Sequence, residues 1–448
     1  MQDRAKKRRF VLYIIVLAAI GGMLYGYDIG IIAGALLFIH NTIAMTDNET
    51  SFLVAAVLGG GALATLVTGV LADWFGRRNM FVAAALIFIS GVLGVSFAET
   101  YPELLIGRLT QGIGVGIITI AIPLYLSESL PSHVRGRGTS AFQLFLTAGI
   151  LLASLISLYF VPSGNWRGMF LSATLPAIVL FVGGLFLPTS PRWLFMKGRY
   201  DQALAVLRLS RSDEEAETEF NEMRSVLIEQ QSDIKHTLWQ KRYMLPLLIA
   251  FAVAILNQLT GINSLLQFSA VILKNSGLSS DLVAVTGSSA ITGLNFVVTI
   301  VALSLIDKLG RKFLLCVGTA GVTLAMVYCG AVFAFMAPGA LKGYMLLGGT
   351  LGFILFFAIG PGVVVWLALS ELLPSRIRSK GMAVGLFLNS LASTLLAAVF
   401  MDLVRHLGYA GTFWLCGFFT LLYFLVAFFL MPETKDQTLE QIEAKFAR

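Results

Sequence analysis

Charged side chains are scarce in this chain. They make up 13% of its 448 residues, whereas hydrophobic residues make up 57%. Soluble domains carry roughly 25% charged residues. A composition so poor in charge argues against an ordinary soluble domain and favours a protein embedded in a membrane.

Cysteine and histidine are also rare, with three and four copies. Cys316, Cys329 and Cys416 lie in separate apolar segments, and an odd number without metal-type spacing argues against a disulfide framework or a zinc site. We expect them to be small buried hydrophobic residues. No nucleophile–base pair or phosphate-binding loop stands out. We therefore expect no metal and no cofactor, and an enzyme is the least favoured class.

Apolar segments long enough to cross a bilayer recur along the whole chain, since about 20 residues suffice for one helix. The fold class predicted is an all-α integral membrane protein with twelve transmembrane helices. The predicted spans are about 10–36, 51–72, 79–98, 103–126, 140–161, 168–187, 244–272, 282–306, 313–336, 343–371, 380–403 and 411–430.

The basic residues predict how these spans are oriented. All but five of the 32 Lys and Arg lie before the first span, after every second span, or beyond the last. Basic residues favour the cytoplasmic side, so we expect both termini there, in a cell (cytoplasmic) membrane. The net charge of +7 then reflects topology and anionic lipid, and gives no indication of nucleic-acid binding.

Two short motifs occur twice. Residues 73–78 read DWFGRR and residues 307–312 read DKLGRK, while residues 127–135 read SESLPSHVR and residues 370–378 read SELLPSRIR. The second match extends over nine residues, so chance is a poor explanation. The repeat predicts two six-helix halves built on one plan.

The division into halves follows from the hydrophilic stretch between them. We expect an N-terminal six-helix bundle at 1–187, a cytoplasmic linker at 188–243, and a C-terminal bundle and tail at 244–448. Parallel halves with a binding site at their interface are a known transporter plan. The linker mixes charges with spaced apolar residues, which favours short amphipathic helices. A partly disordered tether is the alternative.

The repeated loops place acids near arginines at helix ends. Such pairs can latch one helix bundle to another and break when the bundles rock. Alternatively they only anchor the topology and cap helices, since exposed ion pairs contribute about 0–1 kcal/mol. The predicted latch residues are Asp73, Arg77, Arg78, Glu128 and Arg135 in the first half, and Asp307, Arg311, Glu371 and Arg378 in the second.

Asp28 is the only charged residue between positions 10 and 39. A lone carboxylate at the centre of a membrane helix costs about 2.5–3.5 kcal/mol on insertion scales. Such a group is retained when it is paired, faces a water-filled path, or has a function. Because a carboxylate can take up and release a proton, Asp28 indicates proton-coupled transport.

Seven motifs follow one another along nearly the whole chain. They are Gly21-Gly22-x-Leu24-x-Gly26-Tyr27-Asp28, Asp73-x-x-Gly76-Arg77-Arg78, Gly107-Arg108-x-x-x-Gly112-x-Gly114-x-Gly116, Pro123-x-Tyr125-x-Ser127-Glu128, Pro188-x-Ser190-Pro191-Arg192-Trp193-Leu194, Gln258-x-x-Gly261-Ile262-Asn263 and Pro432-Glu433-Thr434-Lys435 with Thr438-Leu439-Glu440. This series resembles the sugar porter family of the major facilitator superfamily, and is closest in motif to bacterial sugar–proton symporters.

The resemblance implies alternating access, with a sugar bound near the bilayer midplane between the halves. The family's sugar ligands fall on Gln143, Asn257, Gln258, Asn263, Asn295, Trp366 and Asn389. Amides both donate and accept, so they match sugar hydroxyls, and an aromatic ring can pack on a pyranose. Alternatively, amides within the membrane only link helices, at about 0.6 kcal/mol each.

Several positions depart from the family pattern. The departures are Asn257 where the family usually has Gln, Gln267 and Phe268 in place of two tyrosines, Ser390 where many carriers have Trp, and Ser393 where Asn is common. These changes alter the pocket, so the sequence leaves the identity of the sugar open. Thr189 replaces a family Glu, which removes one acid from the cytoplasmic charge network.

Arg108 lies in the fourth span, which enters from the outer face near Glu103. At 1.5 Å per residue it is roughly 8 Å deep, from where a long side chain can reach Asp28. The pair resembles the proton-coupling pair of bacterial sugar–proton symporters. A permanent ion pair that only holds two helices together is the alternative.

The function predicted is proton-coupled symport of a monosaccharide, a hexose or a pentose, by a carrier expected to act as a monomer. Its expected partners are the sugar, protons and membrane lipid. A facilitative uniporter of the same fold, in which Asp28 never titrates, is one alternative. A non-transporting sugar sensor is another.

Overall fold

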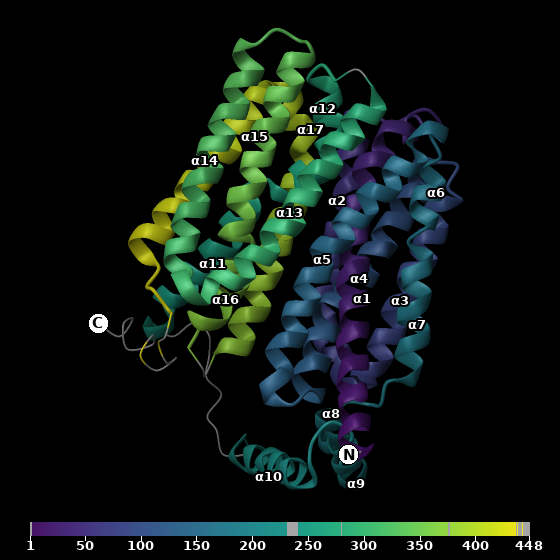
Figure 1. Cartoon of the computed structure of the whole chain (residues 1–448), viewed down its shortest axis with the longest axis vertical. Helices are drawn as coiled ribbons and strands as arrows, with labels where there is room; N and C mark the ends of the chain where they lie inside the picture. The colour runs from purple at the N-terminus through teal and green to yellow at the C-terminus, as the bar shows by residue number, and fades with distance from the viewer. Residues whose placement is uncertain are drawn as a thin grey trace.

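A computed structural model of the protein describes residues 2–230, 241–278, 280–374, 377–435, 437 and 441. These residues form helices and contain no strand, arranged as two long bundles side by side (Figure 1). The helices of the first bundle are α1 (Gln2–Ile39), α2 (Asp47–Phe75), α3 (Arg77–Ser96), α4 (Tyr101–Ser129), α5 (Ser132–Phe160), α6 (Trp166–Leu171) and α7 (Thr174–Phe186). Those of the second bundle are α11 (Lys241–Leu259), α12 (Ile262–Asn275), α13 (Asp281–Leu309), α14 (Arg311–Phe335), α15 (Ala340–Ile359), α16 (Pro361–Glu371) and α17 (Arg378–Leu425).

These helices account for the twelve predicted spans, and the fold class is confirmed. Three spans are each divided into two helices, namely α6–α7, α11–α12 and α15–α16. The last two spans form α17, which contains a non-helical Gly408 with φ 68° and ψ 170°, and the short π-helix η2 (Val426–Leu430) that continues it. Eleven of the described segments are long and apolar enough to cross a membrane, and the last of them, Lys380–Leu430, has 51 residues, enough for two crossings.

Short polar sequences fix where two of the helices begin. Thr46 and Glu49 form a reciprocal capping box at the start of α2, in which the Glu49 carboxylate accepts from the Thr46 backbone N–H at 2.8 Å. Thr100 and Glu103 form the same arrangement at the start of α4. Each box satisfies backbone donors that a helix N-terminus leaves unpaired.

Glycines bring the helices of the first half into close contact. A Cβ atom at Gly26 of α1 would lie 1.8 Å from the carbonyl oxygen of Leu146 in α5, and one at Gly112 of α4 would lie 2.2 Å from that of Val57 in α2. Only glycine permits such approaches. The glycine-rich motif of α4 therefore serves helix packing, and the α1–α5 contact fixes the position of α1, which carries Asp28.

The repeat in the sequence is a repeat in the backbone. Gly76 joins α2 to α3 with φ 90° and ψ 150°, and Gly310 joins α13 to α14 with φ 90° and ψ 160°. At both turns the following arginine, Arg77 or Arg311, donates from Nη1 to a carbonyl oxygen near the end of the preceding helix, at 3.2 Å. The two halves thus share local geometry as well as sequence.

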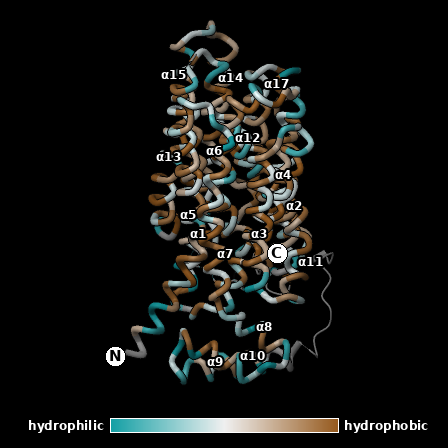
Figure 2. The backbone as a smooth tube through the Cα atoms, turned by 90° about the vertical axis from the view of Figure 1, so that its right-hand side faces the viewer, coloured by the Kyte–Doolittle hydropathy of each residue, from teal (hydrophilic) through white to brown (hydrophobic). Residues whose placement is uncertain are grey.

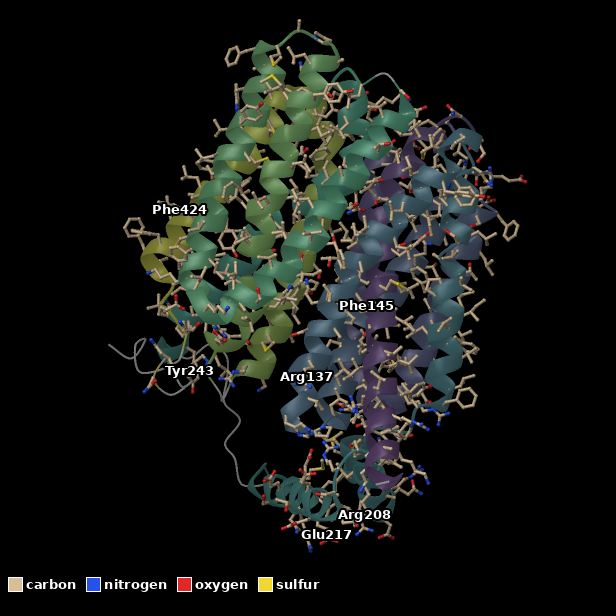
Figure 3. All side chains as sticks on the ribbon, viewed as in Figure 1. Arg137, Phe145, Arg208, Glu217, Tyr243 and Phe424 are labelled. Carbon is tan, nitrogen blue, oxygen red and sulfur yellow. The ribbon has the colours of Figure 1, made fainter. Side chains whose placement is uncertain are left out.

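The segment after α7 forms three short helices, α8 (Pro191–Met196), α9 (Tyr200–Arg208) and α10 (Asp213–Gln230). They lie together beyond one end of the bundles, which we call the linker end (Figures 1 and 2). Their apolar sides enclose a small core, and their polar sides include an ion pair between Arg208 and Glu217 at 3.0 Å (Figure 3). Residues 231–240 of the predicted linker lie outside the described residues.

Arg211 fastens this helical segment to the first half. Its guanidinium donates to the carbonyl oxygens of Ser129 and Leu130 at the end of α4, both at 3.1 Å. It also pairs with Glu219 of α10 through Nη2 at 2.8 Å. The last carbonyls of α4, which have no partner within the helix, thereby hold the linker helices.

The two halves meet toward the opposite end of the molecule, which we call the far end. The Ser154 hydroxyl of α5 is hydrogen-bonded to that of Thr292 in α13 at 2.7 Å. The Met401 backbone N–H of α17 donates to the Ser51 hydroxyl of α2 at 3.0 Å. In Figure 1 the ribbons of the halves diverge from there toward the linker end.

The contact between Ser154 and Thr292 yields a prediction. Hydroxyl oxygens 2.7 Å apart place the two Cβ atoms near the spacing of a disulfide. Ser154→Cys combined with Thr292→Cys should therefore form a disulfide on mild oxidation, detected by mass spectrometry of proteolytic fragments. As a control, Ser154→Cys with Thr286→Cys should not cross-link, because residue 286 lies about 9 Å away along α13. Free thiols at both 154 and 292 after oxidation would contradict this interface.

Candidate functional site

Asp28 and Arg108 form an ion pair in the core of the first half. Arg108 Nη1 lies 2.9 Å from Asp28 Oδ1, and the side chains are 0% and 1% exposed respectively. The same Nη1 donates to Gln111 Oε1 at 2.9 Å. The structure thus brings together the two residues predicted for proton coupling, and adds a third polar side chain to them.

Apolar and polar contacts from α6 hold this pair in place. The Arg108 guanidinium lies over the Phe170 ring, 5.3 Å from its centroid, an arrangement in which the ring face attracts the cation. Tyr27, next to Asp28, donates to the Met169 carbonyl oxygen at 3.2 Å and is hydrogen-bonded to Ser172. Helices α1, α4 and α6 therefore meet at the ion pair.

A second polar cluster lies in the other half, where α11 and α12 join. Gln258 donates from Nε2 to Asn389 Oδ1 at 3.1 Å, and Asn263 donates to Gln258 Oε1 at 2.9 Å. Asn257 donates to the carbonyl oxygen of Pro361 at 3.1 Å. The helix is interrupted at Gly261, which has φ 85°. This interruption lets side chains from α11 and α12 converge.

Four of the seven predicted sugar ligands thus belong to one hydrogen-bonded cluster. The other three, Gln143, Asn295 and Trp366, make no side-chain hydrogen bond to it within the described residues. Gln143 is half-buried on α5, Asn295 is buried on α13, and Trp366 on α16 is 39% exposed. These three positions come from both halves, whereas the cluster belongs to the second half alone.

At the linker end of the first half, Arg77 is held by two acids. Its guanidinium lies 2.9 Å from Asp73 and 2.9 Å from Glu128. Glu128 also accepts a hydrogen bond from the hydroxyl of Ser190, which caps α8. This network joins the turn after α2, the end of α4 and the start of the linker helices.

The second half repeats the network with small changes. Arg311 pairs with Glu371 at 3.3 Å, and the Thr434 hydroxyl donates to Glu371 at 2.6 Å. Thr434 follows the last span as Ser190 follows the sixth. The side chain of Asp307, the counterpart of Asp73, lies outside what the structure describes, as do residues 438–440 of the last sequence motif.

Glu433 adds a contact that the first half lacks. Its carboxylate accepts from the backbone N–H groups of Arg311 at 2.9 Å and Lys312 at 3.1 Å, at the start of α14. Burial by itself would raise the pKa of Glu433, but the N–H donors of these residues, Thr434 and Lys435 outweigh it, and the pKa lies below its ordinary value. Thr189 occupies the equivalent place in the first half.

Three further predicted latch residues also make hydrogen bonds within their own half. Arg78 donates to the Leu185 carbonyl oxygen at 2.5 Å, Arg135 to that of Leu130 at 3.5 Å, and Arg378 to that of Leu373 at 3.2 Å. In this conformation, the contacts described join helices of the same half. A latch between the halves at the linker end stays a prediction.

Sequence reasoning missed two members of these clusters. Gln111 lies one helical turn from Arg108, but a single amide on an apolar helix is not distinctive. Ser393 accepts from Asn263 at 2.7 Å, and it stood out only as a departure from the family pattern. The i,i+3 spacing of Gln111 from Arg108 was the one available signal.

Comparison with known proteins places the chain in a family. The profile of the family described as "Sugar (and other) transporter" matches residues 14–446. The arabinose-proton symporter of Escherichia coli (strain K12) is 34% identical over 443 residues, which cover 98% of this chain and 94% of that protein. The glucose transporter GlcP of Staphylococcus epidermidis is 33% identical over 432 residues, covering 96% of each.

Solved structures of sugar transporters have the same fold as this chain. The inward open conformation of the xylose transporter XylE from E. coli superposes with a TM-score of 0.83 at 26% identity, covering 97% of this chain and 99% of that one. The proton:xylose symporter XylE bound to 6-bromo-6-deoxy-D-glucose superposes with a TM-score of 0.79 at 27% identity, covering 98% and 100%. By profile, sequence and fold, the chain is a multi-pass membrane protein that belongs to the sugar transporter family of the major facilitator superfamily.

Proposed function

We propose that this protein is a secondary active transporter that moves a monosaccharide together with protons. The observation that carries the proposal is the ion pair of Asp28 and Arg108, buried in a helix bundle of the sugar transporter family. A uniporter has no need of a titratable carboxylate in its core. Relatives named for proton symport of arabinose and galactose support this choice.

Proton coupling follows from the electrostatics of the pair. While Asp28 is ionised, Arg108 holds it, and α1 stays bound to α4. Protonation neutralises the carboxylate and removes the Coulombic attraction, which is strong where water is excluded. The contact between α1 and α4 then loosens. Because α1 also packs on α12 and α13 of the other half, the protonation state of Asp28 can bias how the halves rock.

The amide cluster at the junction of α11 and α12 suits a neutral polyol. Its members donate and accept hydrogen bonds, and they include no cation that would clamp a carboxylate or phosphate. These amides satisfy one another. A sugar hydroxyl can replace one amide partner without leaving a buried polar group unpaired, and Gln143, Asn295 and Trp366 would complete the site.

Orientation and organisation follow from the charge distribution. We propose that the linker end is cytoplasmic, with both termini there, because the basic residues gather at that end. The boundaries between the two bundles and the linker would lie near residues 187 and 243. We further propose a carrier that acts as a monomer, in contact with membrane lipid, and has no enzymatic activity.

The charge networks at the linker end would act as switches between the two carrier conformations. Arg77 with Glu128, and Arg311 with Glu371, are positioned to exchange partners when the halves approach each other at the cytoplasmic side. The side chains of these pairs are at most 20% exposed, and for buried pairs the cost of desolvation offsets much of the Coulombic attraction, so they add little net stability. Their role would therefore lie in setting the balance between conformations.

Transport assays in proteoliposomes test the proposal directly. Purified protein is reconstituted, and uptake of a panel of radiolabelled hexoses and pentoses is measured with and without an inward proton gradient. We expect at least one sugar to accumulate above its external concentration only when the gradient is present. Uptake that merely equilibrates, with or without the gradient, would favour the uniporter.

Loss of an amide should weaken sugar binding. We expect Gln258→Ala and Asn263→Ala each to raise the dissociation constant about fivefold to tenfold, because one hydrogen bond of about 1 kcal/mol is lost. Calorimetric titration of the purified variants measures this. Asn275→Ala is the matched control, since this amide of α12 bonds to Tyr409 outside the cluster. Unchanged constants for every transported sugar would rule out the assigned site.

Neutralising Asp28 should uncouple the carrier. Asn imitates the protonated carboxylate but cannot release a proton, so Asp28→Asn should bind sugar and equilibrate it without concentrating it. The measurement is uptake under an inward proton gradient, compared with exchange without a gradient. Asp47→Asn, which removes an acid at the start of α2, should accumulate sugar like the wild type. Undiminished accumulation by Asp28→Asn would refute the role assigned to this residue.

A further inference from the structure

We propose that Gln111 is a positioning residue for proton coupling, which holds Arg108 when Asp28 is protonated. This inference rests on the proposed function, since it concerns how Arg108 is stabilised when protonation of Asp28 breaks the ion pair. The geometry that carries it is one guanidinium nitrogen, Nη1 of Arg108, that donates to two acceptors. One is Asp28 Oδ1 at 2.9 Å and the other is Gln111 Oε1, also at 2.9 Å.

The two acceptors lie on different helices. Asp28 belongs to α1, whereas Gln111 lies three residues after Arg108 on α4, a spacing at which side chains of one helix are neighbours. Any movement of α1 relative to α4 changes the distance from Arg108 to Asp28. The distance from Arg108 to Gln111 depends on the α4 helix alone and can be kept. Gln111 is therefore the partner that remains with Arg108 in both states.

Burial makes a remaining partner necessary. Both Arg108 and Gln111 are 0% exposed, and Nε and Nη2 of Arg108 have no hydrogen-bond partner in the described part of the chain. A buried charge that loses its partner is strongly destabilising. When Asp28 takes up a proton, Gln111 Oε1 and the Phe170 ring are the neighbours that continue to stabilise the guanidinium.

Gln111 is itself held in position by packing. Gly91 of α3 lies so close that a Cβ atom there would be 2.8 Å from Gln111 Cγ and 2.5 Å from its backbone nitrogen. The Cγ methylene of Gln111 is thus packed tightly against α3. Its Nε2 has no partner among the described residues, which leaves it available to the Asp28 carboxyl group when that group is rearranged.

The effect of Gln111 on proton uptake has a definite sign. In the ionised state, Arg108 has Asp28 as its main partner and Gln111 as the second. In the protonated state, Gln111 is the main acceptor. Removing its oxygen therefore costs the protonated state more, and Asp28 should then require a higher proton concentration. Asp28 and Arg108 interact with each other. Among the described residues, Tyr25 on the same helix is a further titratable group that interacts with Asp28.

Two substitutions of Gln111 should move the pH dependence of transport in opposite directions. Gln111→Leu removes the acceptor, so the midpoint of proton-driven uptake should shift about one unit toward acid, within the strength of a hydrogen bond to a charged group. Gln111→Glu is isosteric and adds a carboxylate beside Asp28, which disfavours its ionised form. The midpoint should then shift toward alkaline pH. Thr110→Val, whose hydroxyl bonds only to its own helix at Ile106, should leave the midpoint unchanged.

The experiment measures uptake of a transported sugar in proteoliposomes across a range of external pH, together with calorimetric sugar binding as a check of folding. Opposite shifts for the Leu and Glu variants support the inference. If wild-type uptake depends on pH but the midpoints of the two variants are unmoved, or are both shifted the same way, this inference is overturned and the proposed function is not. A wild type whose uptake is indifferent to the proton gradient overturns the proposed function as well. If the Leu variant does not fold, the isosteric Glu variant decides the question by itself.

Discussion

The structure depends on one electrostatic constraint, which is that a charge buried in a membrane protein must have a partner. Asp28 and Arg108 each carry a charge that the surrounding apolar helices cannot solvate, and they neutralise one another at 2.9 Å. The glycines of α1 and α4 bring these helices close to their neighbours. Helix packing in the first half therefore determines where the ion pair lies. A proton is the natural means of breaking that pair, since it removes one of the two charges.

The second half of the chain has the same backbone plan but a different chemistry. Its polar core is a set of amides at the break between α11 and α12, and its charge network lies at the linker end, around Arg311 and Glu371. The first half thus carries the pair proposed for proton coupling, and the second carries the amide cluster with four of the seven proposed sugar ligands. The halves contact each other at the far end through Ser154 and Thr292, which is where a movement of one half would act on the other.

The sequence was sufficient to predict the twelve spans, because each must supply about 20 apolar residues. It also pointed to Asp28 and Arg108, because each is too costly to be left alone in a membrane helix. Three features could not be predicted. An amide such as Gln111 costs too little to stand out, so its contact with Arg108 was invisible. The loop motifs place acids beside arginines in the sequence, but they do not show whether an arginine pairs within its own half or with the other half. The partners of Arg77 could therefore be identified only from the structure. The last two spans follow each other in one helical element, α17, with only Gly408 between them in a non-helical backbone conformation. The amino-acid composition of this segment does not predict that conformation.

Sugar-induced proton movement tests the central claim most directly. Proteoliposomes or cells in a lightly buffered medium are given a transported sugar, and the external pH is recorded without any imposed gradient. If the ion pair of Asp28 and Arg108 couples the two movements, the medium should become transiently more alkaline as protons enter with the sugar, and a non-transported sugar should have no effect. Sugar entry with no change in external pH would contradict the account.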